Sequence, residues 1–288
     1  MTATTTRTGP WGQDRRLEFI DFRLLWEGRL NRSDLTSFFR ISVPQASLDF
    51  AAYQELAPDN MTYDRTLKAY VASSSFKPVL ANLDPGQYLN ELLQREIGAM
   101  AARDSFIGWA PPVASLPSPI RQVDPQILIR LIRALQSGDA VIVDYRSMTN
   151  FDEPATRTIF PTSLAHDGFR WHVRAFCFQS DKHKDFVLGR INALAEIIPP
   201  PSPVPADHEW DTFVDVVIGP NPNYPPEKRK AIEHDYQMIN GESKLRARKA
   251  QMYYLNRRLN LNGRPGEAVD EHQQIVMLRI EPVPTQAS

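Results

Sequence analysis

Arginine, histidine and aromatic residues alternate along residues 169–178, in an order that could bind an anion or a nucleotide. The alternation is typical of a β-strand, in which successive side chains point to opposite faces. One face, expected on the core, would carry Trp171, Val173, Ala175 and Cys177. The other face would carry Arg170, His172, Arg174 and Phe176. Guanidinium groups form paired hydrogen bonds to phosphate, and aromatic rings stack on bases.

Two neighbouring stretches would add side chains to this candidate site. The residues that share strand faces there are Tyr145 with Ser147, and Phe186 with Leu188 and Arg190. The sequence leaves an alternative open, in which one or both of Arg174 and Arg190 form ion pairs. The acids that could neutralise them are Asp144, Asp167 and Asp185.

Short strands would position these residues. A helix with apolar residues at helical spacing over 127–135 ends at Ser137-Gly138. Short β-like runs follow at 141–145, 158–161, 170–178 and 186–188, and the dipeptide Asp167-Gly168 is a strong hairpin signal. Short strands at this spacing indicate a small barrel.

The block from Gly168 to Ile191 resembles the WYL domain, a small Sm-like β-barrel of bacterial transcription regulators. The Trp-Tyr-Leu signature corresponds to Trp171-His172-Val173, and a later Arg-Ile signature to Arg190-Ile191. Relatives with Trp-His-Val at this place are winged-helix repressors found beside BREX and CBASS anti-phage operons. Those relatives usually carry a His after the Pro that precedes the hairpin, whereas Thr162 follows Pro161 here.

The resemblance implies that the barrel senses a nucleotide or a short nucleic acid effector. It implies ligand contacts near Ser147, Arg174 and Arg190, and two histidines are chemically suitable additions. We therefore predict that the ligand-binding residues are Tyr145, Ser147, His166, His172, Arg174, Phe186 and Arg190.

The predicted helices of the first part of the chain follow the order of a helix-turn-helix domain. Apolar residues at helical spacing predict a first helix from about Arg15, which Gly28 ends. Asn31 can cap a second helix, and Ser42 can cap a third that runs to Leu56. Residues 89–100 are typical of a further helix.

The third helix would be a recognition helix, whose first turns meet base edges in the major groove. Gln45 can bond to adenine, and Val43 or Ala46 can touch the methyl group of thymine. The run around this turn also resembles the DNA-binding domain of the same repressor family, whose members usually carry Gly where Arg40 stands. The predicted DNA-binding residues are Asn31, Arg32, Ser33, Arg40, Ser42, Val43, Pro44, Gln45, Ala46, Ser47, Arg65 and Lys68. The alternative is a three-helix bundle with an ordinary polar surface.

A hairpin after the third helix would form the wing. Its strands are predicted at 61–63 and 69–71, with Arg65 and Lys68 near the tip. Residues 1–80 contain ten Lys or Arg and nine Asp or Glu, so their net charge is only +1. A single domain of that charge would bind DNA phosphates weakly, and we therefore expect two copies on one duplex.

Two Pro-rich stretches divide the chain, which we assign to a multidomain α+β fold with a winged helix-turn-helix, a Sm/SH3-like β-barrel and a C-terminal α/β dimerisation extension. The C-terminal strands are predicted at 213–218 and 274–280, and the helices at 226–236 and 244–259. The basic and apolar stripes of the last helix favour packing on a sheet over a second nucleic-acid surface. The predicted boundaries are a disordered tail (1–14), the winged helix-turn-helix with its following helix (15–105), a linker (106–122), the WYL domain (123–198), a second linker (199–206) and the dimerisation domain (207–288).

Composition excludes several classes of protein. The 288 residues carry a net charge of −1 and a single cysteine, so an internal disulfide and a Cys-rich zinc site are excluded. No apolar run approaches the length of a membrane helix, and no signal peptide is evident, so we expect a cytoplasmic protein. Phosphate-loop, nucleophile-elbow and zinc-protease motifs are missing. We therefore expect no enzyme, no cofactor and no metal.

These features predict a ligand-responsive, sequence-specific transcriptional repressor of a phage-defence operon. It would bind a palindromic operator in double-stranded DNA as a homodimer. One alternative is a nucleic-acid-binding accessory factor, or a factor that regulates an enzyme, without repressor activity. Another is a structural DNA-binding protein that senses nothing.

Overall fold

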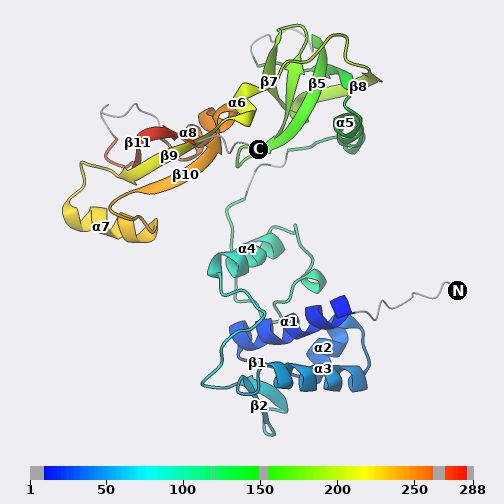
Figure 1. Cartoon of the computed structure of the whole chain (residues 1–288), viewed down its shortest axis with the longest axis vertical. Coiled ribbons are helices and arrows are strands. Elements are labelled where there is room, and N and C mark those ends of the chain that lie inside the picture. The colour runs from blue at the N-terminus through cyan, green and yellow to red at the C-terminus, as the bar shows by residue number, and fades with distance from the viewer. Residues whose placement is uncertain (1–9, 118, 120, 149–154, 262–269, 284–288) are drawn as a thin grey trace, which may run out of the picture. The chain divides into compact units, whose positions relative to one another are not determined.

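The computed structural model describes residues 10–117, 119, 121–148, 155–261 and 270–283 (Figure 1). The chain divides into two compact units, Met1–Pro117 and Ser118–Ser288. Both units combine helices with antiparallel sheets, which confirms the predicted α+β class.

The first unit has the order of elements of a winged helix-turn-helix. Its sheet has the strand order β1-β3-β2, and β2 and β3 form the wing hairpin. The elements are α1 (Pro10–Glu27), β1 (Arg29–Leu30), α2 (Arg32–Phe39), α3 (Val43–Leu56), β2 (Met61–Asp64), β3 (Ala69–Ala72), α4 (Pro85–Glu96) and the 3-10 turn η1 (Ala102–Asp104).

Two helix starts in this unit differ from the prediction. The first helix, α1, begins at Pro10, so residues 10–14 of the expected tail are helical, while residues 1–9 lie outside the described residues. Helix α4 begins four residues before the predicted start, because the Asp84 side chain accepts a hydrogen bond from the amide of Gly86. Pro85 occupies the first turn, where it lacks only a donor that the helix does not use.

The second unit begins with a helix and a five-stranded antiparallel sheet of order β7-β6-β5-β4-β8. Strand β8 was not predicted. Among the described strands no pairing joins β7 to β8, so closure of the sheet into the expected Sm/SH3-like barrel is not confirmed. The elements are α5 (Pro125–Ser137), β4 (Ala140–Tyr145), β5 (Ala155–His166), β6 (Trp171–Cys177), β7 (Lys182–Val187), the turn η2 (Leu188–Arg190) and β8 (Ile191–Ile198).

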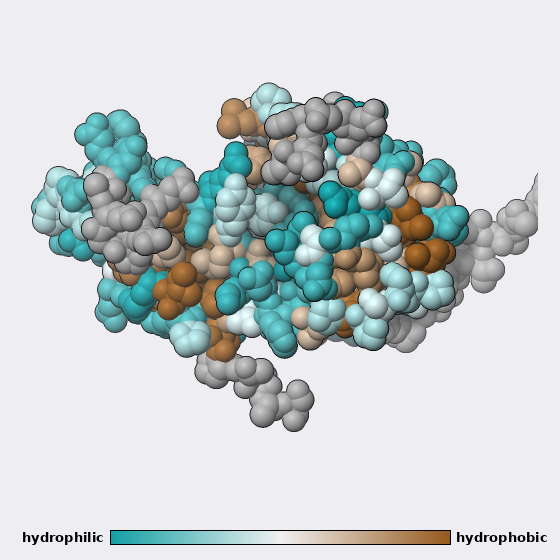
Figure 2. Space-filling model, turned by 90° about the horizontal axis from the view of Figure 1, so that it is seen from above, coloured by the Kyte–Doolittle hydropathy of each residue, from teal (hydrophilic) through white to brown (hydrophobic). Residues whose placement is uncertain are grey.

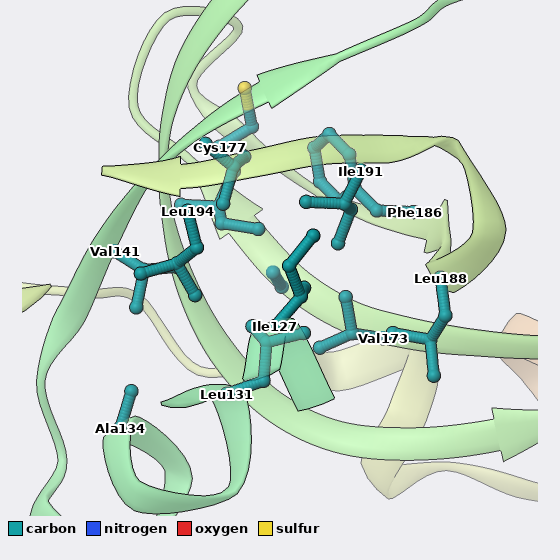
Figure 3. Close-up of a cluster of buried hydrophobic side chains, with 13 residues drawn as sticks. Ile127, Leu131, Ala134, Val141, Val173, Cys177, Phe186, Leu188, Ile191 and Leu194 are labelled. Carbon is teal, nitrogen blue, oxygen red and sulfur yellow. The ribbon is translucent and has the colours of Figure 1, made fainter. Parts of the chain in front are cut away.

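The hydrophobic core of this part lies between α5 and the curved sheet. Figure 3 shows Ile127 and Leu131 of α5 among Val141, Val173 and Phe186 of the strands. The helix ends as predicted at Gly138, whose φ of 70° is a left-handed conformation that glycine adopts readily. The predicted helix therefore packs its apolar face on the strands that carry the candidate pocket.

The remainder of the second unit contains a three-stranded sheet of order β10-β9-β11. Its core is formed by Val216, Ile218, Ile232, Leu261 and Ile275. The elements are α6 (His208–Asp211), β9 (Phe213–Pro220), α7 (Pro226–Asp235), β10 (Ser243–Arg248), the turn η3 (Lys249–Gln251), α8 (Met252–Arg258) and β11 (Ile275–Pro282).

The predicted helix over 244–259 is wrong for its first five residues, 244–248, which belong to strand β10. The basic residues there recur at every second position, which is the period of a strand. Their side chains form ion pairs across the sheet, Arg246 with Asp215 at 3.0 Å and Lys244 with Glu281 at 2.6 Å. The expected basic stripe along one helix is therefore divided between a strand and the short helix α8.

On the face seen in Figure 2, hydrophilic residues surround smaller groups of hydrophobic ones. Within the described part of the chain, no helix has the length and apolar character needed to cross a bilayer.

Candidate nucleic-acid interface and effector pocket

Helix α2 begins with a reciprocal pair of hydrogen bonds at Asn31. The Asn31 side chain accepts from the amide of Asp34 at 3.1 Å, and the Asp34 carboxylate accepts from the amide of Asn31 at 2.7 Å. This capping box fixes the start of the helix. Ser33 also donates to the Asn31 side chain. Asn31 and Ser33, two of the predicted DNA-binding residues, thus already have partners within the turn.

Arg32 connects the second helix to the wing. Its guanidinium donates to the hydroxyl of Tyr70 at 2.9 Å and lies 5.6 Å from the centre of that ring. The Tyr70 ring stacks on Phe50 of α3, with 4.1 Å between ring centres. Arg32 remains exposed at the surface, so it can still approach a phosphate.

The turn between α2 and α3 is held by Arg40 and Ser42. Arg40 has a φ of 53° and ends α2 in the left-handed conformation, where glycine would meet less steric resistance. Its side chain is exposed. The Ser42 hydroxyl caps α3 by accepting from the amide of Gln45 at 3.3 Å. The sequence therefore located both the turn and the start of the recognition helix.

The side chains at the start of α3 divide into buried, internally bonded and exposed groups. Ala46 is fully buried in the core, so its predicted contact with a base is wrong. Gln45 donates to Asp49 at 3.2 Å, and the Ser47 hydroxyl donates to the carbonyl of Val43 at 3.1 Å. Val43 and Pro44 are exposed. The first turn of α3 therefore exposes Val43 and Pro44, whereas Gln45 and Ser47 already have partners within the helix.

The wing tip carries both predicted cations at the surface. Arg65 and Lys68 are exposed in the turn between β2 and β3. The Asp64 carboxylate shapes this turn by accepting from the amides of Thr66 and Leu67 at 2.7 and 2.9 Å. The tip therefore presents positive charge on a fixed turn.

A buried carboxylate in α1 supports the whole first unit and was missed in the sequence. Asp21 accepts from the amides of Val79, Leu80 and Ala81 at 2.7–2.8 Å. It also accepts from the Tyr53 hydroxyl, and burial together with this contact raises the pKa of Tyr53. Asp21 thereby attaches the segment after the wing to the helices.

The predicted pocket strand β6 has its core face where expected, apart from its first residue. Val173, Ala175 and Cys177 lie in the core, whereas Trp171 is 51% exposed. His172 and Phe176 on the opposite face are also buried, because other parts of the chain cover that face.

Arg174 forms ion pairs with protein carboxylates. Its Nε and Nη2 donate to the two carboxylate oxygens of Asp207 at 2.7 and 3.0 Å, and Nη1 donates to Asp185 at 3.3 Å. Arg174 is only 4% exposed. Burial would raise the pKa of Asp207, but hydrogen bonds from Arg174 and from the Trp210 amide lower it. The ion-pair alternative therefore describes Arg174, and the expectation that it lines an open pocket is wrong.

Two more predicted pocket residues are engaged within the sheet. Phe186 is 4% exposed and belongs to the core (Figure 3), so its expected position in a ligand pocket is wrong. Tyr145 packs edge-on against the Phe186 ring, with 5.0 Å between centres, and its hydroxyl accepts from the amide of Val187 at 3.2 Å. Ser147 is half-buried and directly precedes Met148, which lines the cavity described below.

Asp167 connects the hairpin turn to His172. Its carboxylate lies 2.9 Å from His172 Nε2 and 3.2 Å from Arg170 Nε. Burial acts to raise the pKa of Asp167, but hydrogen bonds from His172 and from the amides of Phe169 and Arg170 lower it well below its ordinary value. Asp167 thus remains ionised and is bonded to His172 and Arg170, two residues of the strand face that was predicted to bind the ligand.

Arg190 lies on a cavity of about 660 Å³ that the C-terminal part of the unit helps to form. Among the described residues its guanidinium has no hydrogen bond or ion pair, unlike that of Arg174. Asp167 is the one acid that lines this cavity within the described chain. The lining residues are Arg121, Met148, Asp167, Phe169, Arg170, Arg190, Tyr253, Tyr254, Arg257 and Arg258.

An adjoining cavity of about 420 Å³ shares Arg121, Phe169, Arg170 and Arg190 with the first. His166 and Trp171 line it, and their rings lie 4.9 Å apart. Phe169 is 69% exposed. The sequence therefore located Arg190 and His166 on one site but missed the contribution of α8, because residues 253–258 are remote in the chain.

Comparison with protein families divides the chain into three matches. Residues 12–94 match the BrxR transcriptional regulator winged helix-turn-helix domain, and residues 126–196 match the WYL domain. Residues 213–283 match the BrxR transcriptional regulator C-terminal dimerization domain. The predicted resemblance to winged-helix WYL repressors is confirmed.

The chain is also similar to curated proteins along nearly its full length. It is 42% identical over 267 residues to the DNA-binding transcriptional repressor CapW of Escherichia coli (strain KTE188), covering 93% of this chain and 89% of that protein. The CapW proteins of Pseudomonas aeruginosa and Stenotrophomonas maltophilia are 40% and 39% identical. These alignments cover 94% and 95% of this chain, and 89% and 91% of those proteins.

Proposed function

Because this chain belongs to the family of the DNA-binding transcriptional repressors named CapW, we propose that it represses transcription by binding a specific DNA sequence. The observation that carries the proposal is the exposed start of α3, with Arg32, Arg40, Arg65 and Lys68 exposed on the neighbouring helix, turn and wing. An exposed helix flanked by cations fits the major groove and its phosphates.

The test is equilibrium binding of the full-length chain to labelled duplexes at one fixed salt concentration. The region upstream of its own gene should bind at least a thousandfold more tightly than a scrambled duplex of equal length. Equal affinity for both would contradict sequence-specific repression and favour an accessory or structural DNA-binding role.

We infer that the chain acts as a homodimer on a palindromic site. The match of residues 213–283 to a C-terminal dimerization domain supports this arrangement, as does the low net charge of the first 80 residues. Light scattering should give twice the 32.8 kDa of one chain. A monomer at micromolar concentration, with and without DNA, would contradict the dimer.

The WYL part is proposed to sense an anionic effector, a nucleotide or a short single-stranded nucleic acid. The support is the cavity of about 660 Å³, in which Arg121, Arg190, Arg257 and Arg258 face one acid, Asp167. Asp167 is already bonded to His172 and Arg170, so the cavity has an excess of positive charge. Tyr253 and Phe169 offer rings for stacking on bases.

The effector proposal is tested by thermal unfolding with ATP and with a five-nucleotide single-stranded DNA. A bound ligand should raise the unfolding temperature in a concentration-dependent way. Arg190→Ala should abolish the rise, while Arg133→Ala, which removes an exposed arginine from α5, should preserve it. A rise that survives Arg190→Ala would remove Arg190 from the site.

The regulated promoter is proposed to belong to a neighbouring phage-defence operon in a bacterial cytoplasm. The proposal follows from the family resemblance of the WYL block. Genes of another kind beside this one, with no palindrome upstream of them, would contradict it.

A further inference from the structure

The recognition helix carries no Lys or Arg anywhere between Val43 and Leu56. Its first acid, Asp49, is fully buried and bonded by Arg16 at 2.6 and 3.0 Å. The common arginine–guanine contact is therefore unavailable to this helix. Readout of base edges by α3 has to use other chemistry.

The polar side chains of the first two turns are bonded within the helix or to its neighbours. Ser42 accepts from the amide of Gln45, whose own side chain donates to Asp49. Ser47 donates to the carbonyl of Val43. Any hydrogen bond from these groups to a base would first have to replace an existing one, which reduces the net gain.

The large side chains left exposed on these turns are aliphatic. Val43 is 59% exposed and Leu48 is 64% exposed. Leu48 lies on the side of the helix opposite the buried Ala46, Asp49 and Phe50. Val43 and Leu48, five residues apart, are therefore the exposed apolar side chains that the first two turns of α3 offer to a base.

Positive charge lies on the elements around these two side chains. Arg40 stands in the turn before α3, Arg32 contacts Tyr70 of the wing, and Lys68 lies at the wing tip. Phosphate contacts and base contacts are thus assigned to different elements. The apolar groups that a major groove offers are the C5 methyl groups of thymine.

We propose that Val43 and Leu48 read thymine methyl groups in the major groove of each operator half-site. The proposal rests on DNA binding by α3 and adds the chemistry of its specificity. It makes Leu48, which the sequence pattern did not identify, a specificity-determining residue. It also assigns Gln45 a structural role, because its side chain donates to the Asp49 carboxylate that Arg16 binds.

The experiment starts with a duplex selected from a random library by the full-length chain. Each thymine of one half-site is then replaced by deoxyuridine, which lacks only the methyl group. Removing a methyl from an apolar contact should weaken binding about fourfold. One or two positions per half-site should show this loss.

Variants link each methyl to its side chain. Leu48→Ala should bind the thymine and deoxyuridine duplexes equally at one sensitive position, and Val43→Ala at another. Both residues are exposed, so both variants should unfold at the wild-type temperature. Leu56→Ala removes a 50% exposed leucine from the last turn of the same helix, and it should keep the full discrimination.

Two results overturn the proposal and are distinguishable. Tight binding of the selected duplex with no effect of deoxyuridine at any position would exclude methyl readout, while leaving the repressor function intact. Failure to select any sequence would contradict the repressor function and the methyl readout together.

Discussion

A single buried carboxylate joins distant segments of the chain in each unit. In the first unit, Asp21 joins α1 to the segment 79–81. In the second, Asp207 joins the chain after β8 to Arg174 of β6. Removing one partner of such a group leaves the others buried without compensation, which costs more free energy than the interaction itself contributes.

Asp21→Asn should destabilise the first unit by about 3 kcal/mol, because three amides and the Tyr53 hydroxyl lose a charged acceptor. Hydrogen exchange of α3 amides during urea unfolding measures the loss. Glu55→Gln, an exposed change on α3, is the control. An unchanged midpoint for Asp21→Asn would show that this network contributes nothing.

Asp167→Asn should lower stability by roughly 1–3 kcal/mol at pH 7, because hydrogen bonds to a carboxylate are lost. The folded pKa of Asp167 lies below its unfolded value of about 3.8. The stabilising effect is therefore fully present above about pH 5 and declines as pH falls further. Urea unfolding at pH 7 and pH 3 should show a smaller difference from wild type at pH 3, and exposed Glu196→Gln should show none at either pH. An equal difference at both would contradict this assignment.

Among the secondary-structure elements, the sequence correctly predicted those boundaries that depend on neighbouring residues. Asn31, Ser42 and Gly138 marked helix ends correctly because caps act on neighbouring residues. The helix predicted over 244–259 was correct for residues 252–258, which form α8, but wrong for residues 244–248, where pairing with β9 produces a strand.

The sequence predicted the core face of one strand of the candidate site, and it placed Arg190 and His166 together. Val173, Ala175 and Cys177 followed from alternation. Asp185, one partner of Arg174, was among the acids named from the sequence, whereas the other partner, Asp207, lies 33 residues away. The arginines of α8 are further still. Contacts of this kind depend on packing between distant segments. The alternation of residues within one strand gives no information about that packing.

Asp207→Asn should expose the 199–206 stretch to proteolysis. The change weakens the paired bond to Arg174 and the cap of α6, so this segment should open more often. Limited digestion followed by mass spectrometry of the cut sites should detect several-fold faster cleavage there. Asp211→Asn, four residues on and exposed, should digest like wild type. Equal rates for both variants would mean that the ion pair does not hold the segment.

For the whole molecule, DNA affinity should depend on salt through cations outside the recognition helix. If Lys68 contacts one phosphate in each protomer of the proposed dimer, Lys68→Gln removes two phosphate contacts. The slope of log affinity against log salt should become less negative by about 2. Thr66→Ala at the same wing tip is the control and should leave the slope unchanged. An unchanged slope for Lys68→Gln would show that the wing does not contact DNA.

The separation of charge from the apolar face of α3 has an evolutionary consequence. A repressor and its operator must change together, and an intermediate variant that no longer binds DNA is not retained. Substitutions at the aliphatic positions 43 and 48 would change which DNA sequence is preferred. The arginines and lysine of the neighbouring elements would meanwhile preserve the affinity for DNA phosphates. The operator preference of this chain can thus change through substitutions at a few uncharged positions.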